Sequence, residues 1–494
     1  MGGRPACGEP DVGGAIVTRS RCRESRSAVV LSPARRCALT ALVEAQRRGA
    51  YVRDVLAASP DAAALEGRDR AFALRLALGA TAVMGCADEL LDRFLARPDR
   101  VQPALRWALR IAAFELLYLD TPAHVGVSQG VELARSVARG AAGLANAVLR
   151  RVAEARASYL DARDVLDDRR PGVARARRAG MPVWLADDIA ASRGEAAAAA
   201  VLAAQLQAAP QAVQVAAPAP GSFRPAWADA GETASYPGCV RVGDAALLMA
   251  EGVLERAEAA SSDLNAQLIA GAATRPGTCL EVGAGRGTKT FVMAAQARRV
   301  GWARTHVALD LSAAKCALNA ERMSAAGLGR LETVAGDATD LDAVLAPRDA
   351  RLGAPCRFAT VFVDAPCSGT GTMRRHPEIA WRLSAAEVHE DLPCLQLAIL
   401  RQAARRVEEG GELVYATCSV LRAENEQVVE AFLASAEGAA FVPVPVSAAP
   451  LYDGEAYAEA RSYLRAHEDA QGMFQTVPAP GAFDGHFCAR LVRR

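Results

Sequence analysis

Residues 280–290 read LEVGAGRGTKT, a glycine-rich turn between an apolar strand and a helix. Gly283, Gly285 and Gly287 let the backbone pass close to a ligand, because glycine has no Cβ to stand in the way. The spacing does not complete the GxGxxG of dinucleotide-binding proteins, and it lacks the GxxxxGK[ST] of a P-loop. The acidic residue before the first glycine, Glu281, would suit a cationic ligand better than a pyrophosphate.

Apolar segments that predict strands recur along the chain from this turn onward. They cover residues 279–282, 306–309, 331–334, 360–363 and 413–416, and helical stretches separate most of them. Strands that alternate with helices predict a parallel sheet with helices on both faces. Such sheets bind ligands beyond the carboxyl ends of their strands, so functional residues are expected there.

Acidic residues follow the second and third of these strands. Asp310 ends the second strand, where a carboxylate can accept hydrogen bonds from both ribose hydroxyls of an adenosine. Asp337 follows the third strand and could face the adenine amino group. One such Asp alone is more often a helix cap or turn residue, but three acids at successive strand ends, counting Glu281, predict a nucleoside site. S-adenosylmethionine is a nucleoside that carries a cationic amino-acid end, so these acids favour it as the ligand.

Two cysteines follow the fourth and fifth predicted strands, in DAPCSGTG at residues 364–371 and TCS at 417–419. A single buried cysteine is usually structural, but Cys367 and Cys418 are matched in position and each precedes a serine. Carbon 5 of cytosine is too weak a nucleophile to take a methyl group until a thiolate adds at carbon 6. A second thiol can then assist release, and Asp364 can hydrogen-bond the N3/N4 edge of the base.

The expected site residues divide into two sets. The catalytic set is Cys418, Cys367 and Asp364. The cofactor-binding set is Glu281, Gly283, Ala284, Gly285, Arg286, Gly287, Thr288, Lys289, Asp310, Asp337 and Asp364.

The front of the chain follows a helical pattern from Ser32 to about residue 155. Ser32 and Pro33 open the first helix with a cap residue and a proline. Apolar residues at helical spacing continue through 105–119 and 127–137, with a break at 120–122. The pattern predicts an all-helical domain and by itself no function.

Charge and cysteine usage narrow the classes of function. The net charge is only +1, but basic residues exceed acidic ones up to residue 180 and the reverse holds afterwards. This split fits an RNA-docking module beside a catalytic body, although compositional drift toward Arg would also produce it.

The 12 cysteines include no CxxC pair, so neither a zinc site nor a disulfide framework is predicted. No segment reads as a membrane span or a signal peptide, so the expectation is a cytoplasmic protein.

At the two cysteine motifs the sequence resembles the Sun-type RNA cytosine-5 methyltransferases. HPEIAW at 376–381, SDLNAQ at 262–267 and DGHFCARL at 484–491 extend the match. The resemblance implies that the cysteine of TCS, Cys418, is the nucleophile and that the cysteine of DAPC, Cys367, aids product release. It also implies a Rossmann-like fold and S-adenosylmethionine as cofactor.

The helical front resembles the NusB-type RNA-binding domains. RWALRIAAFELL at 106–117, Pro122, VELA at 131–134 and NAVLR at 146–150 carry that match. A NusB-like front joined to a Sun-type body is the architecture of the bacterial small-subunit ribosomal RNA methyltransferases. The resemblance implies an RNA partner, small-subunit (16S) ribosomal RNA. From the chain's own residues we further expect no metal site and no membrane segment, and we expect a monomer.

The expected architecture is multidomain. Its parts are a disordered basic arm at residues 1–28, an all-α NusB-like RNA-binding domain at 29–160, a linker and small RNA-contacting subdomain at 161–260, and an α/β Rossmann-like S-adenosylmethionine-dependent methyltransferase domain at 261–494.

The sequence departs from the Sun-type pattern at 284–290, where the family usually reads AAPGGKT, at 211–230, which matches poorly, and between Gly238 and Ser262, where residues are added. Three alternatives stay open. They are the same chemistry on transfer RNA or another ribosomal site, a non-catalytic RNA-binding or antitermination factor, and a nucleotide-dependent oxidoreductase. The last two explain neither cysteine.

Overall fold

The computed structural model describes residues 30–160, 173, 176–177, 179–216, 225–229 and 236–494. The expected basic arm at 1–28 lies outside these residues, as do Arg175 and Arg178 of the expected linker and subdomain at 161–260.

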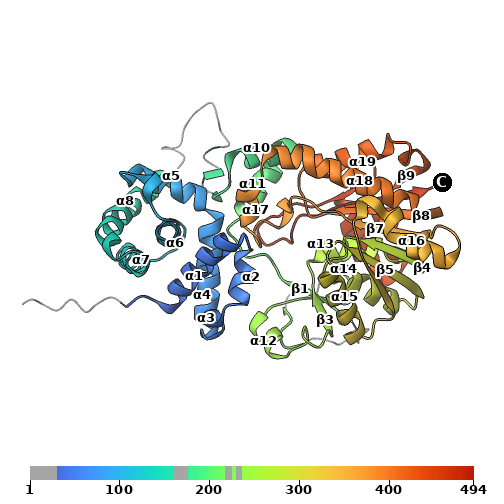
Figure 1. Cartoon of the computed structure of the whole chain (residues 1–494), viewed down its shortest axis with the longest axis horizontal. Helices are drawn as coiled ribbons and strands as arrows, with labels where there is room; N and C mark the ends of the chain where they lie inside the picture. The colour runs from blue at the N-terminus through green and yellow to red at the C-terminus, as the bar shows by residue number, and fades with distance from the viewer. Residues whose placement is uncertain (1–29, 161–172, 174–175, 178, 217–224, 230–235) are drawn as a thin grey trace, which may run out of the picture.

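The front of the chain is a helical bundle with its own hydrophobic core (Figure 1). Its helices are α1 (Pro33–Arg48), α2 (Val52–Ala57), α3 (Pro60–Ala63), α4 (Gly67–Ala82), α5 (Met84–Phe94), α6 (Pro103–Tyr118), α7 (Ala123–Val137) and α8 (Ala142–Leu160). The first helix begins at Pro33 as predicted, although the Ser32 hydroxyl makes no capping bond. Arg35 and Glu115 form a buried ion pair between α1 and α6.

The lengths and compositions of the described helices bear on whether the chain could span a membrane. Taken singly, none of them is long and apolar enough to cross a bilayer; α4 and α5 meet the requirement only as a pair, and the chain bends by 74° between them.

A small sheet follows the bundle. After α10 (Val183–Arg193) and α11 (Glu195–Ala204), the strands β1 (Ala212–Val215), β2 (Cys239–Arg241) and β3 (Ala259–Ser261) pair antiparallel in the order β2-β1-β3. The residues added between Gly238 and Ser262 form β2, β3 and the short helix α12 (Ala245–Ala250). They therefore extend an ordered unit rather than a loop.

The large sheet has eight strands, and five of them are parallel. The parallel strands are β4 (Gly277–Val282), β5 (Arg304–Asp310), β6 (Leu331–Ala335), β7 (Phe358–Asp364) and β8 (Val407–Thr417). The others, β9 (Phe441–Val444), β10 (Phe474–Gln475) and β11 (Phe487–Arg493), pair antiparallel beside β8. The path order is β10-β11-β8-β7-β4-β5-β6, with β9 on β11. All five predicted strands are present, but the sheet is mixed rather than wholly parallel.

Helices cover both faces of this sheet, as predicted (Figure 1). On one face α16 (Leu341–Leu352), α18 (Leu392–Arg405) and α19 (Glu426–Leu433) bury apolar side chains against the strands. On the other, α13 (Leu264–Ala272), α14 (Thr288–Arg299) and α20 (Ala458–Ala466) do the same. The helix α15 (Ala313–Ala325) lies against α14 and β6. Burial on both faces explains why the central strands are almost entirely apolar.

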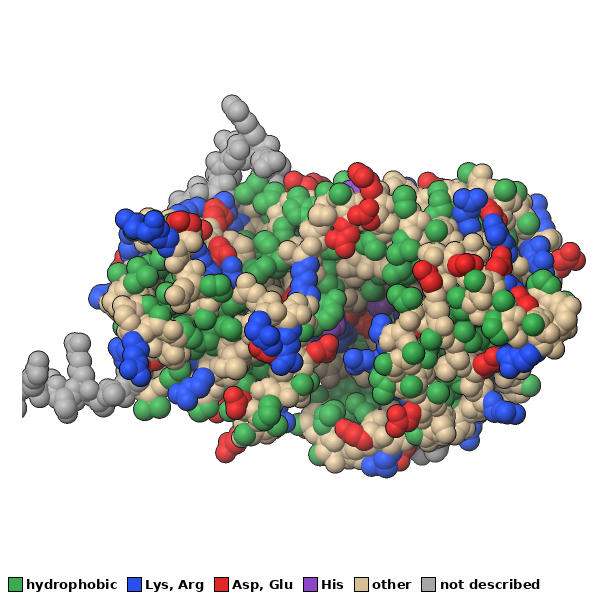
Figure 2. All heavy atoms as spheres, in the orientation of Figure 1, with side chains coloured by type: hydrophobic (Ala, Val, Ile, Leu, Met, Phe, Trp, Pro, Cys, Tyr) green, Lys and Arg blue, Asp and Glu red, His purple; other side chains and the backbone are tan. Residues whose placement is uncertain are grey.

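The helical bundle contacts the part of the chain that holds the large sheet through the segment that follows the first cysteine motif. The Glu378 carboxylate accepts a hydrogen bond from the Val52 backbone N–H at 2.6 Å, and the Trp381 indole N–H donates to the Ala82 carbonyl at 2.9 Å. Trp381 is so close to α5 that a Cβ on Gly85 would lie 2.1 Å from its ring. Figure 2 shows a hollow where the two halves meet, with basic, acidic and histidine side chains gathered in it.

Candidate active site

The glycine-rich turn joins β4 to α14 and lies against the first cysteine loop. The φ angles of Gly283 and Gly285 are +79° and +57°. A Cβ on Gly283 would lie 2.3 Å from the Asp364 carbonyl oxygen, whereas one on Gly285 would have no atom within 4 Å. The turn thus packs tightly on its inner side and leaves open space at Gly285. A ligand can approach the backbone there.

Asp310 holds this turn from the neighbouring strand. One carboxylate oxygen accepts the Gly285 N–H at 2.9 Å, and the other accepts the Ser312 N–H at 2.9 Å. Each carboxylate oxygen has a second lone pair, so Asp310 could still accept bonds from ribose hydroxyls. The open turn and this acceptor fit an adenosine-containing cofactor.

The other predicted acids lie in different surroundings. Asp337 is exposed after β6 and accepts bonds from the N–H and hydroxyl of Thr339. Glu281 is completely buried; its carboxylate accepts a bond from the Thr290 hydroxyl at 2.6 Å and lies 3.0 Å from His306. Through this hydrogen bond to Thr290, the Glu281 carboxylate holds the first turn of α14 against β4. Direct contact between Glu281 and a cofactor stays a prediction.

Four other residues of the turn, besides Lys289, belong to the predicted set. Gly287 directly precedes α14 and has a φ of +83°. Arg286 is exposed, Ala284 is buried, and the Thr288 hydroxyl accepts a 3.4 Å hydrogen bond from Arg322. The turn therefore offers a ligand mainly its backbone.

Lys289 reaches from α14 to the catalytic loops. Its ammonium donates to an Asp364 carboxylate oxygen at 2.7 Å. Burial alone would lower the pKa of Lys289, but Asp364 and Cys418 beside it raise the pKa above its ordinary value. A fixed positive charge therefore lies next to the ends of β7 and β8, a position the sequence had suggested only as part of the cofactor turn.

The two predicted cysteines meet. The Cys367 and Cys418 sulfur atoms are 3.4 Å apart, and each side chain is partly exposed. The hydrogen bond from Cys367 lowers the pKa of Cys418 and outweighs the effect of burial, and Lys289 lowers it further. The same bond and burial raise the pKa of Cys367 well above its usual range. The pair thus supports one thiolate, at Cys418, and one thiol.

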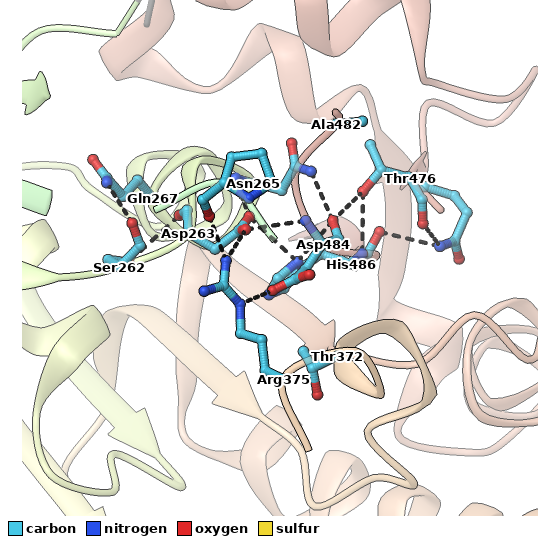
Figure 3. Close-up of polar contacts among 12 residues, drawn as sticks. Ser262, Asp263, Asn265, Gln267, Thr372, Arg375, Thr476, Ala482, Asp484 and His486 are labelled. Atoms are coloured by element: carbon cyan, nitrogen blue, oxygen red, sulfur yellow. Dashed lines mark hydrogen bonds and ion pairs between the residues drawn. The ribbon is translucent and has the colours of Figure 1, made fainter. Parts of the chain in front are cut away.

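A second polar cluster lies beside the cysteine loops (Figure 3). Arg375, a few residues after the first cysteine motif, forms ion pairs with Asp484 and, at 3.3 Å, with Asp263. Asp263 lies 3.9 Å from the ring of His486. Burial lowers the pKa of His486 and raises that of Asp263.

This cluster fixes β11 against the loop that carries Cys418. Because Phe487 pairs with Thr417 in the register of β11 and β8, His486 lies opposite Cys418, just past that pair. The Gly371 N–H donates to the Cys418 carbonyl at 2.8 Å, and the Gly485 N–H donates to the Gly371 carbonyl at 3.0 Å. The two cysteine loops and the segment that leads into β11 are therefore joined by hydrogen bonds into one structure.

Some residues of the site carry no sequence signal of their own. Arg375 lies outside the quoted motifs. Asp263 and Asp484 lie within SDLNAQ and DGHFCARL, but nothing in those motifs indicates a role for them, and only the fold brings the three side chains together. Glu424, which accepts hydrogen bonds from both cysteine loops, lies outside every motif used above, and its polar surroundings, RAENEQ at 422–427, give no hint of burial. Among the described residues, no group of three or more His, Cys, Asp or Glu side chains is arranged to hold a metal ion.

Comparison with known proteins identifies the family of both parts of the chain. The family described as 16S rRNA methyltransferase RsmB/F matches residues 272–492, and the NusB family matches residues 32–154. The small-subunit ribosomal RNA methyltransferase B of Thermus thermophilus is 32% identical over 438 residues, which cover 86% of this chain and 89% of that protein. The Klebsiella pneumoniae protein of the same name is 26% identical, covering 86% and 91%.

A solved structure supports the fold alone. The crystal structure of PH0851 superposes with a TM-score of 0.70 at 17% identity and covers 94% of this chain and 99% of its own. The matches extend over the helical bundle, the glycine-rich turn and both cysteine loops. The chain therefore belongs to the RsmB/F family of 16S rRNA methyltransferases, whose methyl donor is S-adenosylmethionine.

Proposed function

We propose that this protein methylates carbon 5 of a cytosine in small-subunit ribosomal RNA, and that Cys418 attacks carbon 6 of that base. The observation that carries the proposal is the pair of thiols 3.4 Å apart at the ends of β7 and β8, with Lys289 beside Cys418. Methyl transfer to a nitrogen or oxygen atom needs no thiolate, so a site built around two thiols favours carbon 5.

The chain's own residues would act in sequence. The Cys418 thiolate adds to carbon 6, which makes carbon 5 nucleophilic. When bound, S-adenosylmethionine supplies the methyl group that carbon 5 accepts. A water molecule then takes the carbon 5 proton, and the electron pair of that C–H bond forms the double bond between carbons 5 and 6. The bond between carbon 6 and sulfur breaks, and its electron pair returns to Cys418. Cys367, which holds its proton, donates a hydrogen bond to the departing sulfur.

Asp364 and Lys289 would orient the base. Asp364 ends β7 between the glycine-rich turn and Cys367, so its free carboxylate oxygen can accept a bond from the N4 amino group of cytosine. Lys289 holds the other oxygen at 2.7 Å and prevents the carboxylate from turning away. A fixed ion pair needs little reorganisation when charge develops on the base.

The cofactor contacts follow from the order of the strands. Asp364, the glycine-rich turn, Asp310 and Asp337 lie at the carboxyl ends of β7, β4, β5 and β6, which are neighbours in that order. We assign Asp310 to the ribose and Asp337 to the adenine, with the turn against the amino-acid end. The exposure of Asp337 suits a group at the rim of the site.

The RNA would approach from the helical bundle. The NusB match and the excess of Arg in the front part of the chain support a docking role. The relatives' names support the small-subunit ribosomal RNA as substrate. Action in the cytoplasm and as a monomer stay predictions.

The two cysteines can be separated experimentally. Cys367→Ala keeps the Cys418 nucleophile, although it removes the hydrogen bond that lowers the Cys418 pKa. Because it also slows elimination, a covalent protein–RNA complex should accumulate on a denaturing gel and vanish with RNase. Cys418→Ala should form no complex and no product. The exposed Cys394 provides the matched control, since Cys394→Ala should behave as the unchanged protein does.

Two outcomes would contradict the assignment. A complex trapped only by the Cys418 variant would exchange the two roles. Full turnover by both variants would remove the covalent mechanism. Bisulfite sequencing of ribosomal RNA with and without the protein would locate the modified cytosine, and methylation confined to transfer RNA would contradict the substrate.

A further inference from the structure

A buried carboxylate lies beneath both cysteine loops. Glu424, at the end of a short 3-10 helix (Arg422–Glu424), is completely buried. One oxygen accepts the Ser368 backbone N–H at 2.7 Å and the Gln396 amide at 3.1 Å. The other accepts the Ser368 hydroxyl at 2.5 Å and the Ser419 hydroxyl at 2.6 Å. All these donors are neutral, and no ion pair among the described residues involves Glu424.

The two serines directly follow the two cysteines in the chain. Ser368 comes after Cys367, and Ser419 comes after Cys418. Because the same carboxylate oxygen accepts from both hydroxyls, it joins the loop after β7 to the loop after β8. The Thr370 hydroxyl strengthens this connection. It lies 3.1 Å from the Ser419 hydroxyl and accepts a hydrogen bond from the Val420 backbone N–H at 3.0 Å.

The charge of Glu424 also reaches the sulfur atoms. The hydrogen bond from Cys367 is the largest influence on the pKa of Cys418, and burial opposes it; Lys289 lowers that pKa, while Asp364 and Glu424 raise it. Glu424 also contributes to the raised pKa of Cys367. Among the described residues, Cys367, Lys289, Asp364 and Glu424 are the groups with the largest effects on Cys418.

We propose that Glu424 is a positioning residue, which holds the Cys367 and Cys418 loops at the spacing that the two-thiol reaction needs. The proposal rests on the cytosine-5 mechanism given above. A thiol can assist the departing sulfur only if the distance between them stays short, and no covalent link fixes that distance. Buried hydrogen bonds to a charged acceptor are strong enough to hold it.

The position of Glu424 also balances Lys289. A thiolate that is stabilised too strongly becomes a weaker nucleophile. Lys289 and Glu424 have opposite effects on Cys418, so the carboxylate keeps the sulfur reactive as well as ionised. A purely structural polar group would not need a charge at this place.

Glu424→Gln in the full chain tests both parts, because the amide keeps the shape and removes the charge. The first readout is the pH dependence of iodoacetamide labelling at Cys418, followed by mass spectrometry without RNA. Its midpoint should move to lower pH. The second readout is methylation, where kcat should fall roughly tenfold to a hundredfold, as expected from losing buried bonds to a charged acceptor. Affinity for S-adenosylmethionine should stay within about twofold, since Glu424 lies on the cysteine side of the site.

Two further variants make the result specific. Glu430 is exposed on α19, next in the chain, and Glu430→Gln should match the unchanged protein. The double variant Ser368→Ala/Ser419→Ala keeps the charge and removes the hydroxyl bonds, so kcat should fall while the labelling midpoint does not move to lower pH. The double variant also replaces Glu424→Gln as the kinetic test if the latter fails to fold.

The proposal is overturned if Glu424→Gln keeps kcat within about twofold of the Glu430→Gln control. It is also overturned if kcat falls with an unmoved labelling midpoint and a lowered melting temperature, since that describes a structural residue only. If Cys418→Ala still methylates RNA, the cytosine-5 mechanism fails. In that case, a labelling midpoint that still moves in Glu424→Gln would show that Glu424 acts on Cys418 independently of the mechanism.

Discussion

Replacing Gly283 by alanine should destabilise the catalytic body far more than the same change at Gly285. Both glycines have positive φ, +79° and +57°, so each alanine bears a similar backbone cost of about 1–2 kcal/mol. Only the Gly283 Cβ meets another group, the Asp364 carbonyl oxygen at 2.3 Å. Relieving that contact requires the backbone after β7 to shift, which adds about 1–3 kcal/mol.

The difference between the two variants isolates the steric part. At about 2–4 °C per kcal/mol for a domain of this size, Gly283→Ala should melt roughly 2–12 °C below Gly285→Ala. Gly285→Ala should instead weaken S-adenosylmethionine binding, because its Cβ enters the open side of the turn. Thermal unfolding by circular dichroism and calorimetric titration measure the two effects. Equal melting temperatures, or full cofactor affinity in Gly285→Ala, would refute the geometry of the turn.

Three further outcomes are expected. Lys289→Met removes a charge that lowers the Cys418 pKa, so the Cys418 thiolate should form only at higher pH. The rising limb of the methylation–pH profile should therefore move to higher pH. An unmoved limb would contradict the effect of Lys289 on Cys418. Hydrogen peroxide should oxidise the close Cys367 and Cys418 thiols to a disulfide, with two water molecules formed, and dithiothreitol should restore activity; peptide mapping detects the bond, and Cys367→Ala should lose the reversibility. Asp310→Asn should weaken S-adenosylmethionine binding by about 1–3 kcal/mol, and unchanged affinity by calorimetry would assign the ribose elsewhere.

Much of the catalytic sheet could be predicted because its signals are local. Alternating apolar runs and turns fixed β4 to β8 within a few residues, and the ends of those strands carried the motifs. The antiparallel strands β9 to β11 were harder to predict. β10 spans only two residues, and the pairing of β11 with β8 depends on contacts across many intervening residues. Periodicity cannot report a partner so distant in the chain.

The residues of the candidate site also differ in how far the sequence could predict their positions. Cys367 and Cys418 were predictable because thiols at matched strand ends are rare and have few structural explanations. Glu281 was read from its place near the glycines, but the pleat of β4 turns its side chain into the protein interior, where Thr290 and His306 surround it. Which face a strand residue occupies depends on the helix that packs there. The role of Glu424 follows from packing alone.

The pairing of β11 has a consequence for synthesis on the ribosome. β11 comes late in the chain yet lies between β8 and its neighbours β9 and β10. While residues up to about 470 have emerged, β8 has an open edge, and Arg374 and Arg375 lack the Asp484 carboxylate that holds them. The helical bundle can fold long before this. A growing chain therefore carries an exposed strand edge beside a finished bundle, a form for chaperones to protect until the last strand arrives.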